Sequence, residues 1–223
     1  MGRSSPRIKS KNKKANAGVT MTDIFHYTQA ELESLKKKDK KLAAAIEKIG
    51  IIERPVNTDV FAALIDSIIS QQISTKAAHT VRGRLEDLCG TLTPENIYAA
   101  DIADIQKCGM SMRKAGYIKA AADAVYSGAL APESLRDMPD DEVIKHLSDL
   151  PGIGVWTAEM LLIFSLGRKD VLSFGDLAIR RGICNLYGHK ALTREQFLRY
   201  KKRYSPYGSI ASLYLWACSN QKI

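Results

Sequence analysis

Two short stretches of this sequence hold residues whose types and spacing suit the binding of a phosphate next to a carboxylate. The first is Leu150-Pro151-Gly152-Ile153-Gly154-Val155, and the second is centred on Asp176, which follows Gly154 by 22 residues. Gly152 and Gly154 carry no Cβ, so another backbone can approach this turn closely. If a helix begins just after the turn, its unpaired N–H groups and its dipole favour an anion there. A carboxylate held nearby can stabilise a developing positive charge.

The glycine turn lies between two segments with helical signals. Upstream, Pro139-Asp140-Asp141-Glu142 predicts a helix start, because proline stands first and acids follow it. Downstream, residues 155–166 are nearly all apolar, which predicts a buried helix. Together they form a helix–hairpin–helix pattern. A turn of this kind often only joins two helices, and Asp176 could be an ordinary N-cap, although capping and catalysis are compatible.

This combination resembles the helix–hairpin–helix DNA glycosylases, in which a glycine-rich hairpin precedes a loop that bears an aspartate. Trp156 in GIGVWTA, FGDLAIRR around Asp176 and SQQIS at 70–74 are most similar to 3-methyladenine DNA glycosylase II, the AlkA type. The similarity runs from about Phe61 to Trp216. It implies an all-α fold with two helical subdomains flanking a DNA-binding cleft. The sequence agrees, because it lacks alternating strands joined by hairpin turns.

The sequence suggests three parts in space. Residues 1–20 are basic and polar without a hydrophobic period, so we expect a disordered tail. Residues 60–168 would form a central helical domain with the hairpin. Residues 21–59 and 169–223 would together form a second helical domain.

Hydrophobic spacing and capping residues predict the individual helices. One charged surface helix is expected over 29–48. A second helix begins near Val60 and is capped by Asn57 or Thr58. Further helices are expected at 75–89, 94–107 and 113–127.

The resemblance implies roles for individual residues. Asp176 is the expected catalytic residue, which would stabilise the oxocarbenium ion and help water attack. The expected base pocket comprises Gln71, Trp156, Met160, Leu177 and Trp216. The expected DNA contacts are Gln72, Ser111, Lys114, Gly152, Ile153, Gly154 and Thr157. Main-chain carbonyls of Ser148, Leu150 and Ile153 could hold a structural sodium or potassium ion at the hairpin.

Several of these roles have competing interpretations. Gln72 stands where relatives place a wedge in the DNA, but the AlkA type has leucine there, so Gln72 could be a polar helix end instead. Trp156 and Trp216 could be ordinary core packing. Met160 and Leu177 stand where the AlkA type has an aromatic residue and a tyrosine, which indicates a less aromatic pocket.

Ser111 and Lys114 are among the expected DNA contacts because they lie in a segment that resembles the hairpin. Residues 108–115 align with residues 151–158, and each segment precedes a predicted helix. This resemblance reflects either a degenerate second hairpin that contacts phosphate or a chance similarity.

Charge and cysteine content narrow the class of protein. The net charge is +9, but the first 20 residues hold six Lys/Arg and no acid, which leaves +3 for the remainder. A basic tail on a mildly basic body fits nucleic acid, although a solvated charge run is the alternative. Cys89, Cys108, Cys184 and Cys218 are far apart and form no C-x-x-C pair, so we expect no zinc site, disulfide framework or iron–sulfur cluster.

The remaining expectations concern location and partners. No apolar run approaches the ~20 residues needed to cross a bilayer, and no signal-peptide h-region is present. We therefore expect an intracellular monomer, in the cytoplasm and nucleoid or in a eukaryotic nucleus. Its partner would be double-stranded DNA that contains a damaged base.

The residue at position 156 favours one type of glycosylase. Lyase-type relatives place a lysine where Trp156 stands, and use it to attack the sugar as a Schiff-base nucleophile. Its absence favours monofunctional excision of alkylated purines such as 3-methyladenine and 7-methylguanine, in base excision repair, with no required cofactor. The alternatives are a bifunctional glycosylase/lyase for oxidised bases and a non-catalytic DNA-binding module. Asp176 argues against the second.

Overall fold

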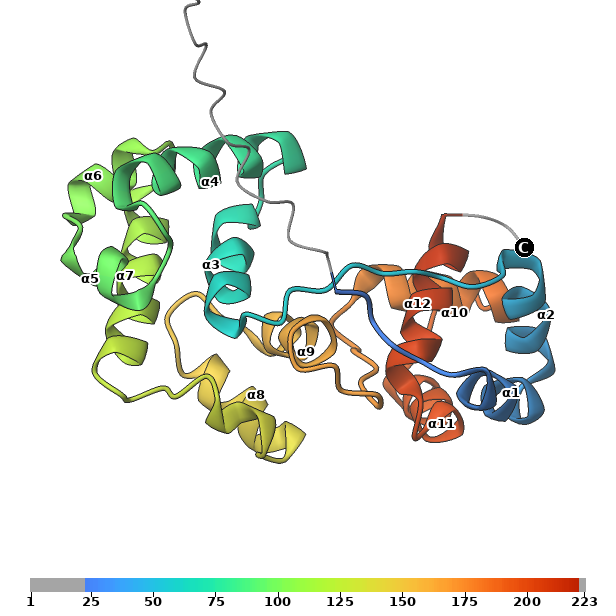
Figure 1. Cartoon of the computed structure of the whole chain (residues 1–223). Helices are drawn as coiled ribbons and strands as arrows, with labels where there is room; N and C mark the ends of the chain where they lie inside the picture. The colour runs from blue at the N-terminus through green and yellow to red at the C-terminus, as the bar shows by residue number, and fades with distance from the viewer. Residues whose placement is uncertain (1–22, 221–223) are drawn as a thin grey trace, which may run out of the picture.

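The computed structural model describes residues 23–220, and every regular element among them is helical (Figure 1). The all-α prediction is confirmed. One isolated antiparallel bridge joins Ile24 and Pro55. None of the helices in this range combines the length and hydrophobicity that crossing a membrane requires. The basic segment 1–20 lies outside the described residues.

Twelve α-helices and one short 3-10 helix make up this part of the chain. The α-helices are α1 (Gln29–Lys38), α2 (Lys40–Ile49), α3 (Val60–Ser70), α4 (Thr75–Cys89), α5 (Pro94–Ala99), α6 (Ile102–Lys107), α7 (Met112–Tyr126), α8 (Asp140–Ser148), α9 (Val155–Phe164), α10 (Leu177–Tyr187), α11 (Arg194–Tyr204) and α12 (Gly208–Ser219). The 3-10 helix is η1 (Ser134–Arg136).

The helices gather in two groups, with α9 in the middle of the view (Figure 1). In one group α3 packs against α4, α7 and α9, and α8 packs against α9. In the other, α12 packs against α2, α10 and α11, while α1 packs against α2 and α11. The second group therefore combines helices from early and late parts of the sequence. The hairpin lies in the first group, and α10, which follows Asp176, lies in the second.

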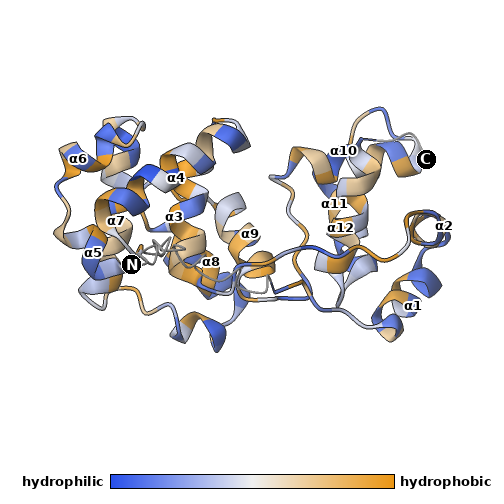
Figure 2. Ribbon diagram, turned by 45° about the horizontal axis from the view of Figure 1, so that its top comes forward, coloured by the Kyte–Doolittle hydropathy of each residue, from blue (hydrophilic) through white to orange (hydrophobic). Residues whose placement is uncertain are grey.

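Helix α3 forms the centre of the first group. Its residues Phe61, Leu64, Ile65, Ile68 and Ile69 are at most 5% exposed. They follow the predicted i, i+3, i+4 spacing, and burying each such side chain contributes roughly 1.5–3 kcal/mol. Hydrophobic residues also run along α9 (Figure 2), and its later part is buried as predicted, whereas Val155 and Trp156 at its start are exposed. These two helices pack against each other, and the hairpin leads directly into α9.

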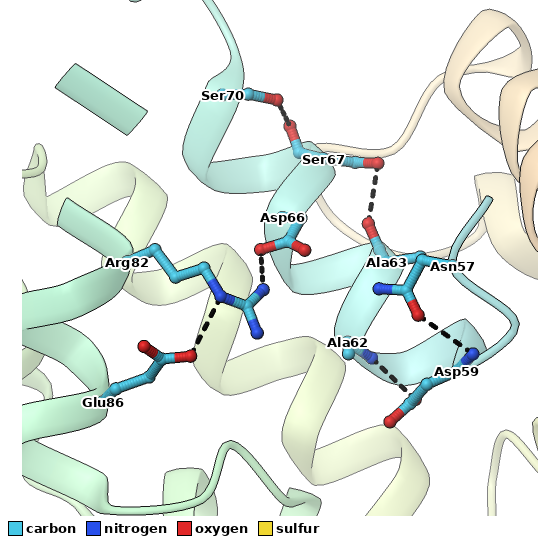
Figure 3. Close-up of polar contacts among 9 residues, drawn as sticks. All are labelled: Asn57, Asp59, Ala62, Ala63, Asp66, Ser67, Ser70, Arg82 and Glu86. Atoms are coloured by element: carbon cyan, nitrogen blue, oxygen red, sulfur yellow. Dashed lines mark hydrogen bonds and ion pairs between the residues drawn. The ribbon is translucent and has the colours of Figure 1, made fainter. Parts of the chain in front are cut away.

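The N-cap of α3 differs from the prediction by one or two residues (Figure 3). Asp59 caps the helix, since its Oδ1 accepts a hydrogen bond from the Ala62 amide at 2.9 Å. Asn57 instead accepts one from the Asp59 amide at 3.1 Å, which fixes the cap. Predicting Asn57 or Thr58 was wrong because three capping residue types stand side by side and all satisfy the pattern.

Two predicted helices are each broken in two by an aspartate. The helix expected over 29–48 divides at Asp39, whose Oδ1 accepts from the Leu42 amide at 2.9 Å and whose Oδ2 pairs with Arg203 at 2.6 Å. The helix expected over 94–107 divides at Asp101, which accepts from the Ala103 amide at 2.7 Å. A short carboxylate that binds nearby N–H groups competes with helix continuation.

The packing of α10 on α12 depends on Gly182. A Cβ on this residue would lie 2.0 Å from the Leu215 carbonyl oxygen, so backbone would have to move. We expect Gly182→Ala to lower the free energy of unfolding by about 2 kcal/mol or more, as overpacking against rigid backbone does. Urea unfolding followed by circular dichroism measures this change.

Gly83 in the interior of α4 provides the matched control. A Cβ there would meet nothing within 4 Å. Gly83→Ala should therefore stabilise the protein by roughly 0.5–1 kcal/mol, because alanine loses less entropy in a helix. Equal effects of the two substitutions would contradict a close approach of α10 to α12.

Candidate functional site

The hairpin between α8 and α9 exposes backbone amides at the start of a helix. Gly152 has φ +83°, and a Cβ there would lie 2.2 Å from Cδ2 of Tyr117, so only glycine fits. The Ile153 amide donates to the Leu150 carbonyl at 3.1 Å and closes the turn. Gly154 is the N-cap of α9 and has no side chain to occupy the first amides. These amides are therefore available to an anion.

The residues named for a cation site lie in and next to the hairpin. Ser148, Leu150 and Ile153 contribute carbonyls, and the Leu150 carbonyl already accepts one hydrogen bond. The Ser148 hydroxyl is buried and has no hydrogen-bond partner among the described residues. Residues 23–220 contain no cluster of three or more His, Cys, Asp or Glu side chains that could hold a metal ion. The three main-chain carbonyls named for a cation carry no charge of their own, and the acidic residue beside them is Asp149.

Asp176 is held by three hydrogen-bond donors from two helices. Its Oδ1 accepts from the amides of Ala178 and Ile179 at 2.8 Å each, which caps α10. Its Oδ2 accepts from Nε1 of Trp156 on α9 at 3.0 Å. The residue is 7% exposed. The carboxylate is therefore oriented before any substrate arrives, and it links the two groups of helices.

A second contact from α9 holds the loop that precedes Asp176. The buried Ser173 hydroxyl donates to the carboxylate of Glu159, one helical turn after Trp156. Gly175 fits between these contacts, since a Cβ there would lie 3.4 Å from Cβ of Trp156. Residues 173–176 are consequently fixed to α9 at two points, and a displacement of α9 would displace Asp176.

The Glu159→Gln variant is expected to gain stability relative to the parent as the pH rises. Burial raises the pKa of Glu159 above its ordinary value of 4.5; Asp176 adds to this, while Ser173 and Lys201 oppose it. Because the folded state holds this proton more tightly, the stabilisation is complete below about 4.5 and is lost as the pH rises through the folded-state pKa. Glutamine does not titrate and escapes that loss.

Urea unfolding of both proteins at a series of pH values tests this sign. The unfolding free energy of Glu159→Gln minus that of the parent should increase between about pH 4.5 and the folded-state pKa of Glu159. Ser173→Ala removes a hydrogen bond that lowers the pKa of Glu159, so in that background the upper end of this pH range should move to higher pH. A difference that stays flat or falls would show that Glu159 ionises freely in the folded protein.

A cavity of about 460 Å³ opens beside Asp176. We call it the Asp176 pocket; it is lined by Ile49, Ile52, Arg54, Trp156, Phe164, Asp176, Leu213, Trp216 and Ala217. Phe164 and Trp216 stack with their ring centroids 5.6 Å apart. Trp156 is 47% exposed although it is a large aromatic residue. Two aromatic walls and one carboxylate suit a flat, electron-poor ring next to a developing cation.

The structure brings only some of the predicted pocket residues to this cavity. Trp156 and Trp216 line it together with Asp176. Leu177 is 67% exposed and lies outside it, and Met160 packs against the core. Gln71 also lies elsewhere, because its Nε2 donates to the Gly152 carbonyl at 2.8 Å. Gln71 therefore supports the hairpin.

A second hollow, of about 530 Å³, lies between the loop after α3, the start of α7 and Gly152. We call it the hairpin hollow. Gln72 lines it with φ 58°, the only non-glycine residue at positive φ in the described chain. Ser111 lines it as well and caps α7, accepting from the Lys114 amide at 3.3 Å. The turn before Ser111 shares one feature with the main hairpin, because Gly109 and Gly152 both have positive φ, +109° and +83°.

Lys114 has a different place from the one expected. Its ammonium donates to the carbonyls of Ile69, at 2.8 Å, and Gln71. Burial lowers the pKa of Lys114. It thereby fixes the loop that bears Gln72, and one of its three N–H groups remains without a partner among these contacts, at the edge of the hairpin hollow. Ile153 and Thr157 are buried, at 4% and 8% exposure, so their side chains face the core.

Part of the Asp176 pocket was missed by the sequence reasoning. Ile49, Ile52 and Arg54 come from the end of α2 and the segment that follows it. No motif marks them. Phe164 was recognised only as one apolar residue of a buried helix, whereas it forms a wall of the pocket.

A hairpin with free amides, followed by an oriented aspartate at the edge of an aromatic pocket, defines a helix–hairpin–helix DNA glycosylase. Residues 65–206 match the family described as HhH-GPD superfamily base excision DNA repair protein, and the chain belongs to that family. The family expected from the sequence is confirmed.

Similar proteins agree with this assignment. The chain is 33% identical over 203 residues to DNA-3-methyladenine glycosylase 1 of Schizosaccharomyces pombe, covering 88% of this chain and 89% of that protein. It resembles a DNA-3-methyladenine glycosidase from Bacillus halodurans with a TM-score of 0.81 and 37% identity, over 89% of this chain and 93% of that one. It also resembles 3-methyladenine DNA glycosylase of S. pombe in complex with abasic DNA, with a TM-score of 0.74 and 32% identity, over 86% and 98% of the two chains.

Proposed function

We infer that this protein is a monofunctional DNA glycosylase that excises alkylated purines, of the 3-methyladenine and 7-methylguanine type, in base excision repair. The observation that carries the inference is Asp176, oriented by three donors at the edge of an aromatic pocket. The names of its relatives, DNA-3-methyladenine glycosylases at about one-third identity, support the substrate class. The substrate is duplex DNA, and we propose that a monomer acts on it wherever the cell keeps its genome.

The hairpin would hold one DNA phosphate. The amides that begin α9 have no side-chain cap, and Gly154 leaves open space where a Cβ would otherwise stand. A monovalent cation held by the carbonyls of Ser148, Leu150 and Ile153 would supply positive charge beside that phosphate. The unsatisfied Ser148 hydroxyl supports such a site.

The Asp176 pocket would receive the extruded base. Flipping a nucleotide out of a duplex costs a few kcal/mol, and less for a damaged base. Stacking on an aromatic side chain returns roughly 1–3 kcal/mol per base. Trp156, Phe164 and Trp216 offer aromatic surfaces at this position. An alkylated purine that carries a positive charge gains further from an electron-rich ring face, by about 0.5–2 kcal/mol.

Asp176 would act on the sugar. When the glycosidic bond breaks, its electron pair leaves with the base and the sugar becomes an oxocarbenium ion. The carboxylate stabilises that cation and orients water, which adds to the anomeric carbon and loses a proton. A cationic alkylpurine departs as a neutral base, so no dedicated acid is needed. No lysine lines the pocket within the described chain, so a Schiff base with the sugar has no nucleophile.

Single-turnover excision from matched duplexes tests this function. Cationic alkylpurines should be released first, hypoxanthine more slowly and 8-oxoguanine least, with strand breaks only after alkali. Strand breaks without alkali would favour the glycosylase/lyase alternative. Binding to every duplex without release of any base would favour a non-catalytic module.

A further inference from the structure

Two opposite charges face the Asp176 pocket. Among the described residues that line it, Asp176 and Arg54 are the charged ones, and the others are aliphatic or aromatic. Asp176 has a role in the chemistry of the sugar. Arg54 has no role in the mechanism above, yet a base that enters the pocket would share it with this cation.

The residues that line the pocket come partly from the segment that matches the family and partly from the segments on either side of it. Of its nine lining residues, Trp156, Phe164 and Asp176 fall within the segment 65–206 that matches the family. The other six lie outside that segment, and Arg54 is the charged one among them. The family segment therefore provides the carboxylate, while flanking segments provide most of the wall that would surround a base.

The backbone around Arg54 is anchored, and its side chain rests on the pocket wall. The Arg54 carbonyl accepts from the Phe25 amide at 2.8 Å, and the next residue, Pro55, forms a bridge with Ile24. Its guanidinium carbon lies 5.1 Å from the centre of the Phe164 ring. Within residues 23–220 this guanidinium makes no ion pair or hydrogen bond. Arg54 is an exposed residue that contacts Phe164 and lines the pocket, so its N–H groups lie near a bound base and remain free to donate.

The chemistry of a guanidinium determines which bases it favours. Arg is a planar group with five N–H donors and no acceptor, and it recognises the O6 and N7 edge of guanine-type bases. It would donate to an oxygen at position 6 of a purine and oppose an amino group there. Its charge would also oppose a base that is itself cationic.

We propose that Arg54 is a specificity-determining residue that raises the excision of neutral 6-oxopurines, such as hypoxanthine, relative to cationic 3-methyladenine. This rests on the proposed glycosylase function. Arg54 supplies a hydrogen-bond donor to the 6-oxo group and a repulsion to the charged base. Charged purines have weaker glycosidic bonds and would therefore be released much faster than neutral ones. Arg54 makes this difference in rate smaller.

The test compares Arg54→Met with the parent on three lesions. Hypoxanthine is neutral with a 6-oxo group, 3-methyladenine is cationic with a 6-amino group, and 7-methylguanine is cationic with a 6-oxo group. Hypoxanthine and 7-methylguanine are placed in matched duplexes, and 3-methyladenine is released from methylated DNA. Single-turnover rates are measured. Arg54→Lys keeps the positive charge but lacks the planar guanidinium group. Lys48→Met is the control, because it removes an exposed charge of α2 that lies near the pocket but does not line it.

Arg54→Met should lower the hypoxanthine rate relative to the 3-methyladenine rate by about tenfold, the size of one good guanidinium–base contact. The effect on 7-methylguanine should be intermediate, and Lys48→Met should leave the ratio unchanged. Arg54→Lys keeps the charge and N–H donors that can also reach the O6 and N7 edge, so its hypoxanthine-to-3-methyladenine ratio should lie closer to that of the parent than the ratio of Arg54→Met does. An unchanged ratio in a variant that still releases 3-methyladenine would overturn the role of Arg54 alone. Failure of the parent to release any of the three bases would instead overturn the proposed function.

Discussion

Replacing Asp176 with asparagine is expected to lower the excision rate by about 10²-fold or more, as when a preorganised electrostatic group is removed. Asparagine can keep the cap of α10, because its carbonyl oxygen can accept from Ala178 and Ile179. Its amide group would then face Nε1 of Trp156, and both atoms are donors. The variant therefore loses the charge and the orienting contact together. DNA binding should persist, since removal of a negative charge does not weaken contacts to phosphate.

Trp156→Phe separates these two losses. Phenylalanine keeps an aromatic surface but has no N–H to donate to Asp176. The Trp156→Phe variant therefore loses the orienting contact but keeps the charge, and its excision rate should fall less than that of Asp176→Asn. Single-turnover excision of 7-methylguanine and duplex affinity are measured for both variants. Near-parent turnover by Asp176→Asn would reduce Asp176 to a helix cap. Equal losses in both variants would show that orientation, and not charge, is the main contribution of Asp176.

Introducing aspartate at Gly154 is expected to weaken DNA binding by about 10²-fold, because a carboxylate placed against a phosphate opposes it and removes a charge-assisted hydrogen bond. The fold should survive. Gly154 has φ −99°, which any residue adopts, and a Cβ there meets nothing within 4 Å. Affinity for a duplex with an abasic site, measured by fluorescence anisotropy at several salt concentrations, provides the readout.

Gly154→Ala is the matched control for that variant. It adds the same Cβ without the charge, so its affinity should stay near that of the parent. The slope of log affinity against log salt should become shallower only in Gly154→Asp, because fewer counterions are then released. A folded Gly154→Asp protein that binds as tightly as Gly154→Ala would exclude the hairpin from the DNA interface.

Features that depend on neighbours in sequence could be predicted. The hairpin is specified by two glycines between helix signals, and the buried face of α3 by the spacing of its apolar residues. Asp176 was marked by its distance from Gly154 and by the helix pattern after it. Each of these signals lies within a few turns of chain, where local geometry decides the outcome.

Features that depend on distant contacts could not be predicted. The local cap at Asp39 ends the helix, but its ion pair with Arg203, far along the sequence, could not be predicted from the run of lysines around it. Lys114 was expected to contact phosphate, but the carbonyls that bind it belong to the end of α3. Arg54 carries no signal of its own, since only the packing of the segment after α2 brings it over Phe164.

The order in which the chain is synthesised gives the packing of α12 a further consequence. The helices α3 to α9 are contiguous in sequence, so they can fold as a unit while the ribosome is still making the rest. The other group must wait, because α12 completes it by packing on α2 and α10. Trp216 and Leu213, which close the Asp176 pocket, arrive with α12. A nascent chain can thus present a folded hairpin before it has a complete base pocket, which is closed only after α12 has docked.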